Sequence, residues 1–146
     1  MRTLATFAVC LAPAVLALPC AAQDHPNLAG TWQFDASKSE QHTSKIAEAT
    51  WVIEESDNSI HITENGAGKK VDLKCSTDGK DCSIAGEKAK ASFWFNGPLL
   101  VEMETRGDHV NRYRMKLSDE GKTLTVELNS IVPRDDNADV LVFAKK

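Results

Sequence analysis

Histidine is the side chain best suited to proton transfer near neutral pH, and the histidines of this chain are scattered. The sequence has four, at positions 25, 42, 61 and 109. His61 and Glu64 are a candidate pair of base and acid, but they are three residues apart, so along a strand their side chains would point to opposite faces. The chain has no glycine-rich phosphate loop and no His-Glu-x-x-His motif. We therefore predict no catalytic residues and no cofactor, although an enzyme remains one of the alternatives below.

His25 is a weak candidate for metal binding. If the chain is cleaved before Gln23, its free amine, two backbone amides and the His25 imidazole would form a four-nitrogen square that suits Cu(II) or Ni(II). Any histidine in the third position produces such a set, and cyclisation of Gln23 would remove the amine. We therefore predict no metal site.

Arg112, Tyr113 and Arg114 are a candidate for anion binding. Two arginines on the inner face of a strand could hold an anion through paired hydrogen bonds. Adjacent residues of a strand face opposite sides, so either the arginines or the tyrosine points inward. Met115 and Leu117 alternate with Tyr113 on one face. This pattern favours arginines that point outward to solvent.

Cys75 and Cys82 are predicted to form a disulfide. They flank a polar segment, residues 76–81, that is typical of a hairpin turn, so the bridge would join two neighbouring strands. The other two cysteines, Cys10 and Cys20, fall in the predicted leader. No further ligands lie near Cys75 and Cys82 that would indicate a metal site.

Residues 1–22 have the features of a secretory signal. Arg2 is followed by an uncharged run from Leu4 to Leu18 that is too short to span a bilayer comfortably, and small residues precede Gln23. Residues 23–146 then form one domain, which we expect to be periplasmic or secreted. The formal net charge of −4 and the lack of a basic stripe argue against nucleic acid as a partner. No later stretch is long and apolar enough for stable membrane insertion.

Short β-rich runs separated by turn signals fill the rest of the chain, and helical periodicity is nearly absent. Asn96-Gly97 is the strongest hairpin signal among the turns. A meander of many strands must protect its edges, and closing on itself is the simplest way to do so. We predict an all-β fold, an antiparallel up-and-down β-barrel of about 8–10 strands, with a β-sandwich as the alternative.

Alternation along the strands predicts which side chains face the barrel interior. In the run that follows Asn96-Gly97, the inward set is predicted to be Leu99, Val101 and Met103, with Glu102 and Glu104 on the wet face. These inward side chains would contact a ligand, or would form an ordinary core if the barrel is filled. The predicted ligand-binding residues are Trp51, Phe93, Phe95, Met103, Tyr113 and Met115.

Gly30-Thr31-Trp32 resembles the Gly-x-Trp signature of lipocalins. Residues 30–35, residues 119–126 and residues 141–143 resemble small exported lipocalin-like proteins of bacteria, a calycin-type group that is mostly uncharacterised. The resemblance implies a barrel whose closed end is plugged by Trp32. Lipocalins also place a basic residue over this tryptophan, and Lys145 and Arg134 are the two candidates.

The second lipocalin motif, Thr-Asp-x-x-Tyr, is missing, because Thr77-Asp78 is followed by Gly79 in a turn. A ten-stranded barrel like those of fatty-acid-binding proteins therefore fits comparably. The leading hypothesis is an exported, non-catalytic protein that holds a small hydrophobic or amphipathic molecule. The alternatives are a periplasmic or secreted interaction or inhibitor protein with a filled barrel, and an enzyme of lipocalin-like shape.

Overall fold

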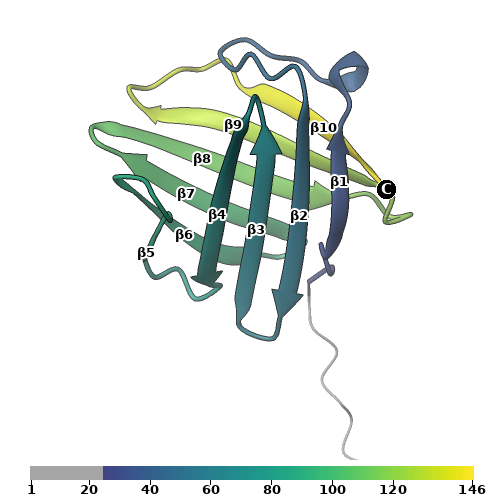
Figure 1. Cartoon of the computed structure of the whole chain (residues 1–146), viewed down its shortest axis with the longest axis horizontal. Helices are drawn as coiled ribbons and strands as arrows, with labels where there is room; N and C mark the ends of the chain where they lie inside the picture. Colours follow the sequence, from purple (N-terminus) through teal and green to yellow (C-terminus); the bar gives the residue numbers. More distant parts are fainter. Residues whose placement is uncertain (1–24) are drawn as a thin grey trace, which may run out of the picture.

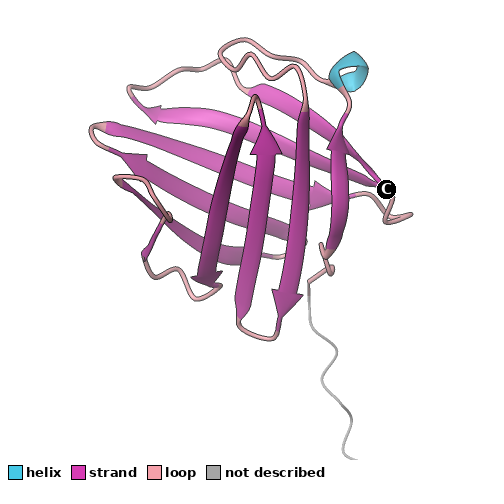
Figure 2. Cartoon of the chain, viewed as in Figure 1, coloured by secondary structure: helices cyan, strands magenta, loops and turns pink. Residues whose placement is uncertain are grey.

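The computed structural model describes residues 25–146, which fold into one antiparallel sheet of ten strands (Figures 1 and 2). A single turn of 3-10 helix, η1 (Ala36–Lys38), is the only helix in this part of the chain. The predicted leader, residues 1–22, lies outside the described residues. The strands are β1 (Gly30–Phe34), β2 (Ala49–Ser56), β3 (Ser59–Gly66), β4 (Lys69–Ser76), β5 (Cys82–Ser83), β6 (Ala89–Asn96), β7 (Leu99–Arg106), β8 (His109–Leu117), β9 (Thr123–Val132) and β10 (Asp139–Lys145).

The sheet curls into a barrel because its strands follow one another in an up-and-down order. Hydrogen-bonded neighbours run β4-β3-β2-β1-β10-β9-β8-β7-β6-β5, so the first and last strands of the chain pair with each other. The two edges of the sheet meet, since β4 also contacts β6. The result is a nearly closed ten-stranded barrel, which confirms the predicted all-β barrel rather than the sandwich. No helix among the described residues is long and apolar enough to span a membrane.

A disulfide joins the two edge strands of the sheet. Cys75 of β4 is bonded to Cys82 of β5, and their Cα atoms lie 5.6 Å apart. The predicted hairpin between these cysteines is wrong, because Cys82 pairs with Ala91 of β6 instead. The loop between them is held by β6, where the Gly79 N–H donates to the Phe93 carbonyl oxygen over 2.8 Å. The bridge therefore fastens the seam of the barrel.

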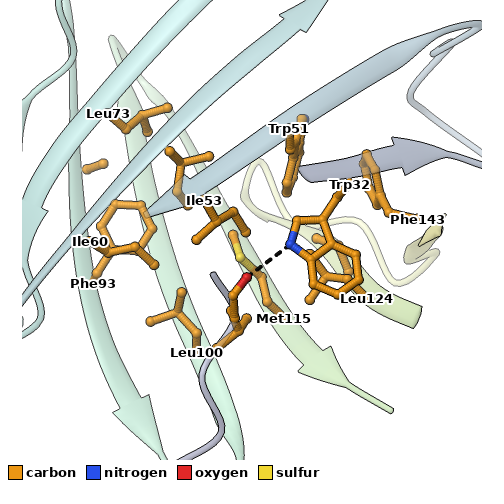
Figure 3. Close-up of a cluster of buried hydrophobic side chains, with 14 of the residues drawn as sticks. Trp32, Trp51, Ile53, Ile60, Leu73, Phe93, Leu100, Met115, Leu124 and Phe143 are labelled. Atoms are coloured by element: carbon orange, nitrogen blue, oxygen red, sulfur yellow. Dashed lines mark hydrogen bonds between the residues drawn. The ribbon is translucent and has the colours of Figure 1, made fainter. Parts of the chain in front are cut away.

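One end of the barrel, which we call the closed end, is filled with apolar side chains (Figure 3). Trp32 of β1 is fully buried there, and its Nε1–H donates to the carbonyl oxygen of Leu28 over 3.0 Å. A buried indole needs such a partner for its N–H. Met115, Leu124 and Phe143 surround it and are equally buried. The packed tryptophan agrees with the plug that the lipocalin resemblance implies.

Lys145 is the basic residue that lies over the tryptophan. β1 pairs with β10 so that Trp32 is opposite Lys145, and the lysine Nζ is 5.3 Å from the centre of the indole ring. Gly30 leaves room for the lysine stem: a Cβ at this position would lie 2.8 Å from the Lys145 Cε, and the φ of +152° disfavours other residues. Glycine and tryptophan of the Gly-x-Trp motif therefore both contact the same lysine.

The register of β7 differs from the predicted one. Phe93 and Phe95 of β6 pair with Glu102 and Leu100 of β7, and directly paired residues share a face of the sheet. Leu100 and Glu102 are both buried inside the barrel. Val101 is apolar and buried, but it lies on the outer face of the barrel, where it pairs with Trp94. The predicted inward set is therefore wrong for Leu99, Val101 and Met103.

Candidate ligand cavity

A cavity of about 710 Å³ lies beyond the packed core, toward the other end of the barrel. Along β8 and β9 the inner face changes from Met115 and Leu124 in the core to Tyr113 and Leu128 on the cavity wall. The volume is within the usual range for small-molecule sites, about 300–1,000 Å³. Within the barrel its wall consists mainly of apolar and aromatic residues with one acid: Trp51, Glu64, Val71, Tyr113, Leu128 and Leu141.

The rim of the cavity is formed by two connections. One is residues 44–48, just before β2, and the other is residues 65–69 around the turn between β3 and β4. Lys45, Glu48 and Lys69 are exposed on this rim, whereas Ile46 is partly buried and packs against the core. The rim therefore carries charges of both signs above a mainly apolar wall.

A buried aspartate holds the connection that forms one side of the rim. Asp139 has no exposed surface, and its carboxylate accepts hydrogen bonds from the N–H groups of His42 (2.5 Å), Thr43 (2.9 Å) and Ser44 (2.6 Å). Burial alone would raise the pKa of this carboxyl, but these hydrogen bonds hold the pKa below its usual value. An ionised Asp139 therefore anchors the loop at the mouth of the cavity.

Glu102 places a carboxyl group in the barrel interior. It is 2 % exposed and lies on the inner face of β7 between Phe93 of β6 and Tyr113 of β8. Its carboxyl makes no hydrogen bond within the described part of the chain. Burial raises the pKa of Glu102 well above its usual value, and the nearby carboxylates of Glu64 and Glu104 raise it further.

Glu64 and Tyr113 line the cavity from different parts of the barrel wall. Burial raises the pKa of Glu64 to about 7, the Glu104 carboxylate adds to this effect, and Arg106 opposes it. Burial also raises the pKa of the Tyr113 phenol well above its usual value, with a further contribution from the three glutamates. Neither group has a hydrogen-bonding side-chain partner among residues 25–146.

Glu104 completes a group of three inward carboxyls, Glu64, Glu102 and Glu104, which we call the carboxyl cluster. The Oε1 of Glu104 accepts a hydrogen bond from the Nε–H of Arg106 over 3.1 Å, and Arg106 also forms a salt bridge with Glu87. Burial raises the pKa of Glu104 as well. The guanidinium of Arg106 thus pairs with one of the three carboxyls, Glu104, and lowers the pKa of Glu64 from a distance, so acid exceeds base in this part of the interior.

Glu64 can exchange protons near neutral pH, because its pKa is raised to about 7, and the pKa values of Glu102 and Glu104 are raised as well. Within residues 25–146, no three His, Cys, Asp or Glu side chains are arranged to hold a metal ion. Of the cluster, Glu64 lines the cavity and can offer a polar contact to a guest there.

The structure separates the six predicted ligand-binding residues. Trp51 and Tyr113 lie on the cavity wall. Phe93 and Met115 are fully buried in the packed core, and Phe95 is partly buried at its margin. Met103 is on the outer face, opposite Arg112, so its predicted place inside the barrel is wrong. The cavity residues that were not among the predicted ligand-binding residues are Glu64, Val71, Leu128 and Leu141; Glu102 and Glu104 do not line the cavity, but Glu104 acts electrostatically on Glu64, and both Glu64 and Glu104 act on Glu102.

Arg112 and Arg114 lie on the outer face of β8, as the alternation with Tyr113 favours. Arg114 forms a salt bridge with Glu127, its neighbour across the β8–β9 ladder. Arg112 lies between Met103 and Asn129 on the same face. An anion clamp inside the barrel is therefore excluded for these two arginines.

The His25 side chain packs at the closed end of the barrel. Its ring stacks on Phe95 with a centroid distance of 3.4 Å, and its Nδ1 is 3.4 Å from the Glu55 carboxylate. Gln23 and Asp24, the other members of the four-nitrogen set, lie outside the described residues. His61 faces outward between Glu54 (2.9 Å) and Asp72 (3.0 Å), away from the barrel interior.

Comparison with solved structures places this barrel among fatty-acid-binding-protein-like, calycin-type folds. A protein described as REP1-NXSQ fatty acid transporter matches with a TM-score of 0.65 and 15% identity over 82% of this chain and 96% of that one. The wild-type fluorescent protein UnaG matches with a TM-score of 0.62 and 18% identity over 81% and 96% of the two chains. No protein family and no curated protein sequence matches the chain. At these identities the likeness shows a shared fold.

Proposed function

We propose that this protein is an exported, non-catalytic binding protein that holds a small hydrophobic or amphipathic molecule inside its barrel. The observation that carries the proposal is the cavity of about 710 Å³, whose wall is mainly apolar and which extends to the rim of the barrel. Apolar burial at roughly 25 cal/mol per Å² would drive binding, and the interior polar groups would orient the guest.

The similar structures support this proposal at the level of fold. One of them is described as a fatty acid transporter, and its chain is matched over almost its whole length. A filled barrel, as an interaction protein would have, is disfavoured by the size of the cavity. Export is supported by the leader-like residues 1–22 and by the disulfide at the seam, since disulfides persist in oxidising compartments.

Binding of Nile red, a neutral apolar dye that fluoresces in apolar surroundings, tests the proposal. We expect saturable binding with one dye per barrel. Val71→Trp should abolish it by filling the cavity, because Val71 lies on the wall. Val52→Trp is the matched control, since Val52 alternates with the inward Trp51 and Ile53 and faces outward. Absence of binding to the unmodified protein, or equal binding to both variants, would refute a carrier.

Export is tested separately by expressing the full chain in a bacterial host and determining where the protein accumulates and which residue begins it. We expect a mature chain that starts at Gln23 in the exported fraction. A cytoplasmic protein that retains residues 1–22 would contradict this part of the proposal.

A further inference from the structure

The interior of the barrel contains polar groups that the protein itself leaves without partners. Glu102 is 2 % exposed, and neither its carboxyl nor the Tyr113 hydroxyl is hydrogen-bonded within the described residues. Buried polar groups are nearly always hydrogen-bonded, so an unpartnered carboxyl beside a cavity needs an explanation. A guest that donates hydrogen bonds would supply the missing partners.

The acidic groups of the barrel interior, below the rim, favour a positive guest. β3 contributes Glu64 to the cavity wall, and the inner face of β7 carries Glu102 and Glu104, whose charges act on Glu64 or on each other, and Arg106, which pairs with Glu104. The wall residues of β2, β8, β9 and β10 carry no charge at neutral pH, and β4 contributes Lys69 at the rim. Arg106 is the cation that pairs with the cluster, and it is shared with Glu87 near the surface, whereas Lys145 lies over Trp32 at the closed end. A carboxylate head group placed inside would therefore meet three acids and little compensating charge.

We propose that the cavity takes an apolar molecule bearing a protonated amine, whose N–H groups bind the carboxyl cluster of Glu64, Glu102 and Glu104. This rests on the proposed binding function and adds the chemical class of the ligand. An ammonium group has three donors and no acceptor, which matches a site of unpartnered acceptors. Folding has already removed the Glu102 carboxyl from water, so the guest does not bear that cost again.

The rival arrangement is an amphipathic anion in the opposite orientation. Lys45 and Lys69 are exposed on the rim, where they could hold a carboxylate while its chain fills the cavity. The two arrangements use different residues, so variants of the cluster and of the rim separate them.

Three ligands with the same alkyl chain test the proposal: dodecylamine, dodecanol and dodecanoate, each below its micelle concentration, measured by displacement of Nile red and by calorimetry. At pH 8 we expect the amine to bind at least about tenfold more tightly than the alcohol, and the carboxylate to bind more weakly than either. Amine affinity should rise from pH 5.5 to pH 8, because the cluster must lose protons to pair with the cation.

Glu64→Gln combined with Glu102→Gln should lower amine affinity about tenfold or more and leave dodecanol binding unchanged. Lys45→Gln combined with Lys69→Gln is the matched control and should spare the amine. The proposal would be overturned if dodecanoate bound as tightly as dodecylamine or more tightly, or if Glu64→Gln with Glu102→Gln left the affinity for dodecylamine unchanged. Dodecanol binding would in either case still support a carrier. If neither dodecanol nor Nile red binds, the proposed function itself fails.

Discussion

The two ends of the barrel use the same strand alternation for different purposes. At the closed end Met115 of β8, Leu124 of β9 and Phe143 of β10 are apolar and fully buried, and Trp32 packs with them (Figure 3). At the open end the same strands contribute Tyr113, Leu128 and Leu141 to a cavity, with the carboxyl cluster nearby. One end is organised for stability, and the other carries polar groups that cost stability.

This difference indicates where function lies. Packed apolar residues need no ligand to explain them, whereas unpartnered carboxyls in a barrel interior reduce stability unless something binds them. Residues that weaken a fold in this way are expected at functional sites. Variants of the two ends should therefore have opposite consequences for stability and for binding.

Trp32→Ala should have the largest effect. Removing a fully buried indole and the hydrogen bond to Leu28 should lower the free energy of unfolding by about 3–5 kcal/mol. Trp94→Ala is the matched control, because Trp94 is only partly buried on the outer face and should cost much less. Equal losses in urea unfolding for the two variants would show that the closed end is not the principal core.

Removal of the disulfide should have the next largest effect. Cys75→Ser with Cys82→Ser opens a short covalent loop at the seam, and we expect a loss of about 2–3 kcal/mol in the chain-entropy model. Nile red affinity should change little at temperatures where the variant is folded, since neither cysteine lines the cavity. A large loss of affinity in the folded variant would instead tie the seam to binding.

Asp139→Asn should cost about 2 kcal/mol at pH 7, because it weakens several charge-assisted hydrogen bonds at the rim. The pKa of Asp139 is lowered by folding, so its contribution is present above the usual carboxyl pKa and is lost as the pH falls through the folded pKa. Urea unfolding from pH 7 to pH 3 should show the difference shrink in acid. A difference independent of pH would argue against this role of the charge.

Glu102→Gln should have the smallest effect and the opposite sign. Folding raises the pKa of Glu102, so its stabilising contribution is complete below the usual value near 4.5 and is lost as the pH rises through the folded pKa. We expect the variant to be more stable than the unmodified protein at pH 8, and equally stable at pH 4, with the difference growing as the pH rises.

Glu127→Gln is the control for Glu102→Gln, because Glu127 lies on the outer face and is paired with Arg114. It should give no gain in stability at pH 8. A destabilised Glu102→Gln protein at pH 8 would mean that the interior carboxylate has a partner that stabilises it.

Much of the fold could be predicted from the sequence because strand alternation and turn residues are local signals. The barrel was predicted in this way, whereas the Trp32 plug was implied by the resemblance of Gly30-Thr31-Trp32 to the lipocalin signature. The register of β7 was also encoded locally: the turn at Asn96-Gly97 pairs Asn96 with Leu99, which places Glu102 opposite Phe93. The prediction followed the hydrophobicity of Val101 and Met103 instead of the turn geometry.

The carboxyl cluster and the seam could not be predicted, because both depend on closure of the barrel. Glu64 and Glu104 are forty residues apart in the sequence. Their side chains approach each other only because the sheet closes into a barrel, so that β3 and β7 face the same interior. Cys75 and Cys82 lie close in sequence, which suggested a hairpin, but they belong to opposite edges of the sheet. Local patterns do not reveal which edges meet.

Methyl-group NMR during titration with dodecanol would locate the guest most directly. We expect the resonances of the wall residues Val71, Leu128 and Leu141 to shift with saturation, while those of Leu124 and Ile60 in the packed core stay nearly unchanged. Shifts confined to the outer face, or none at saturating dodecanol, would contradict a ligand site at the open end of the barrel.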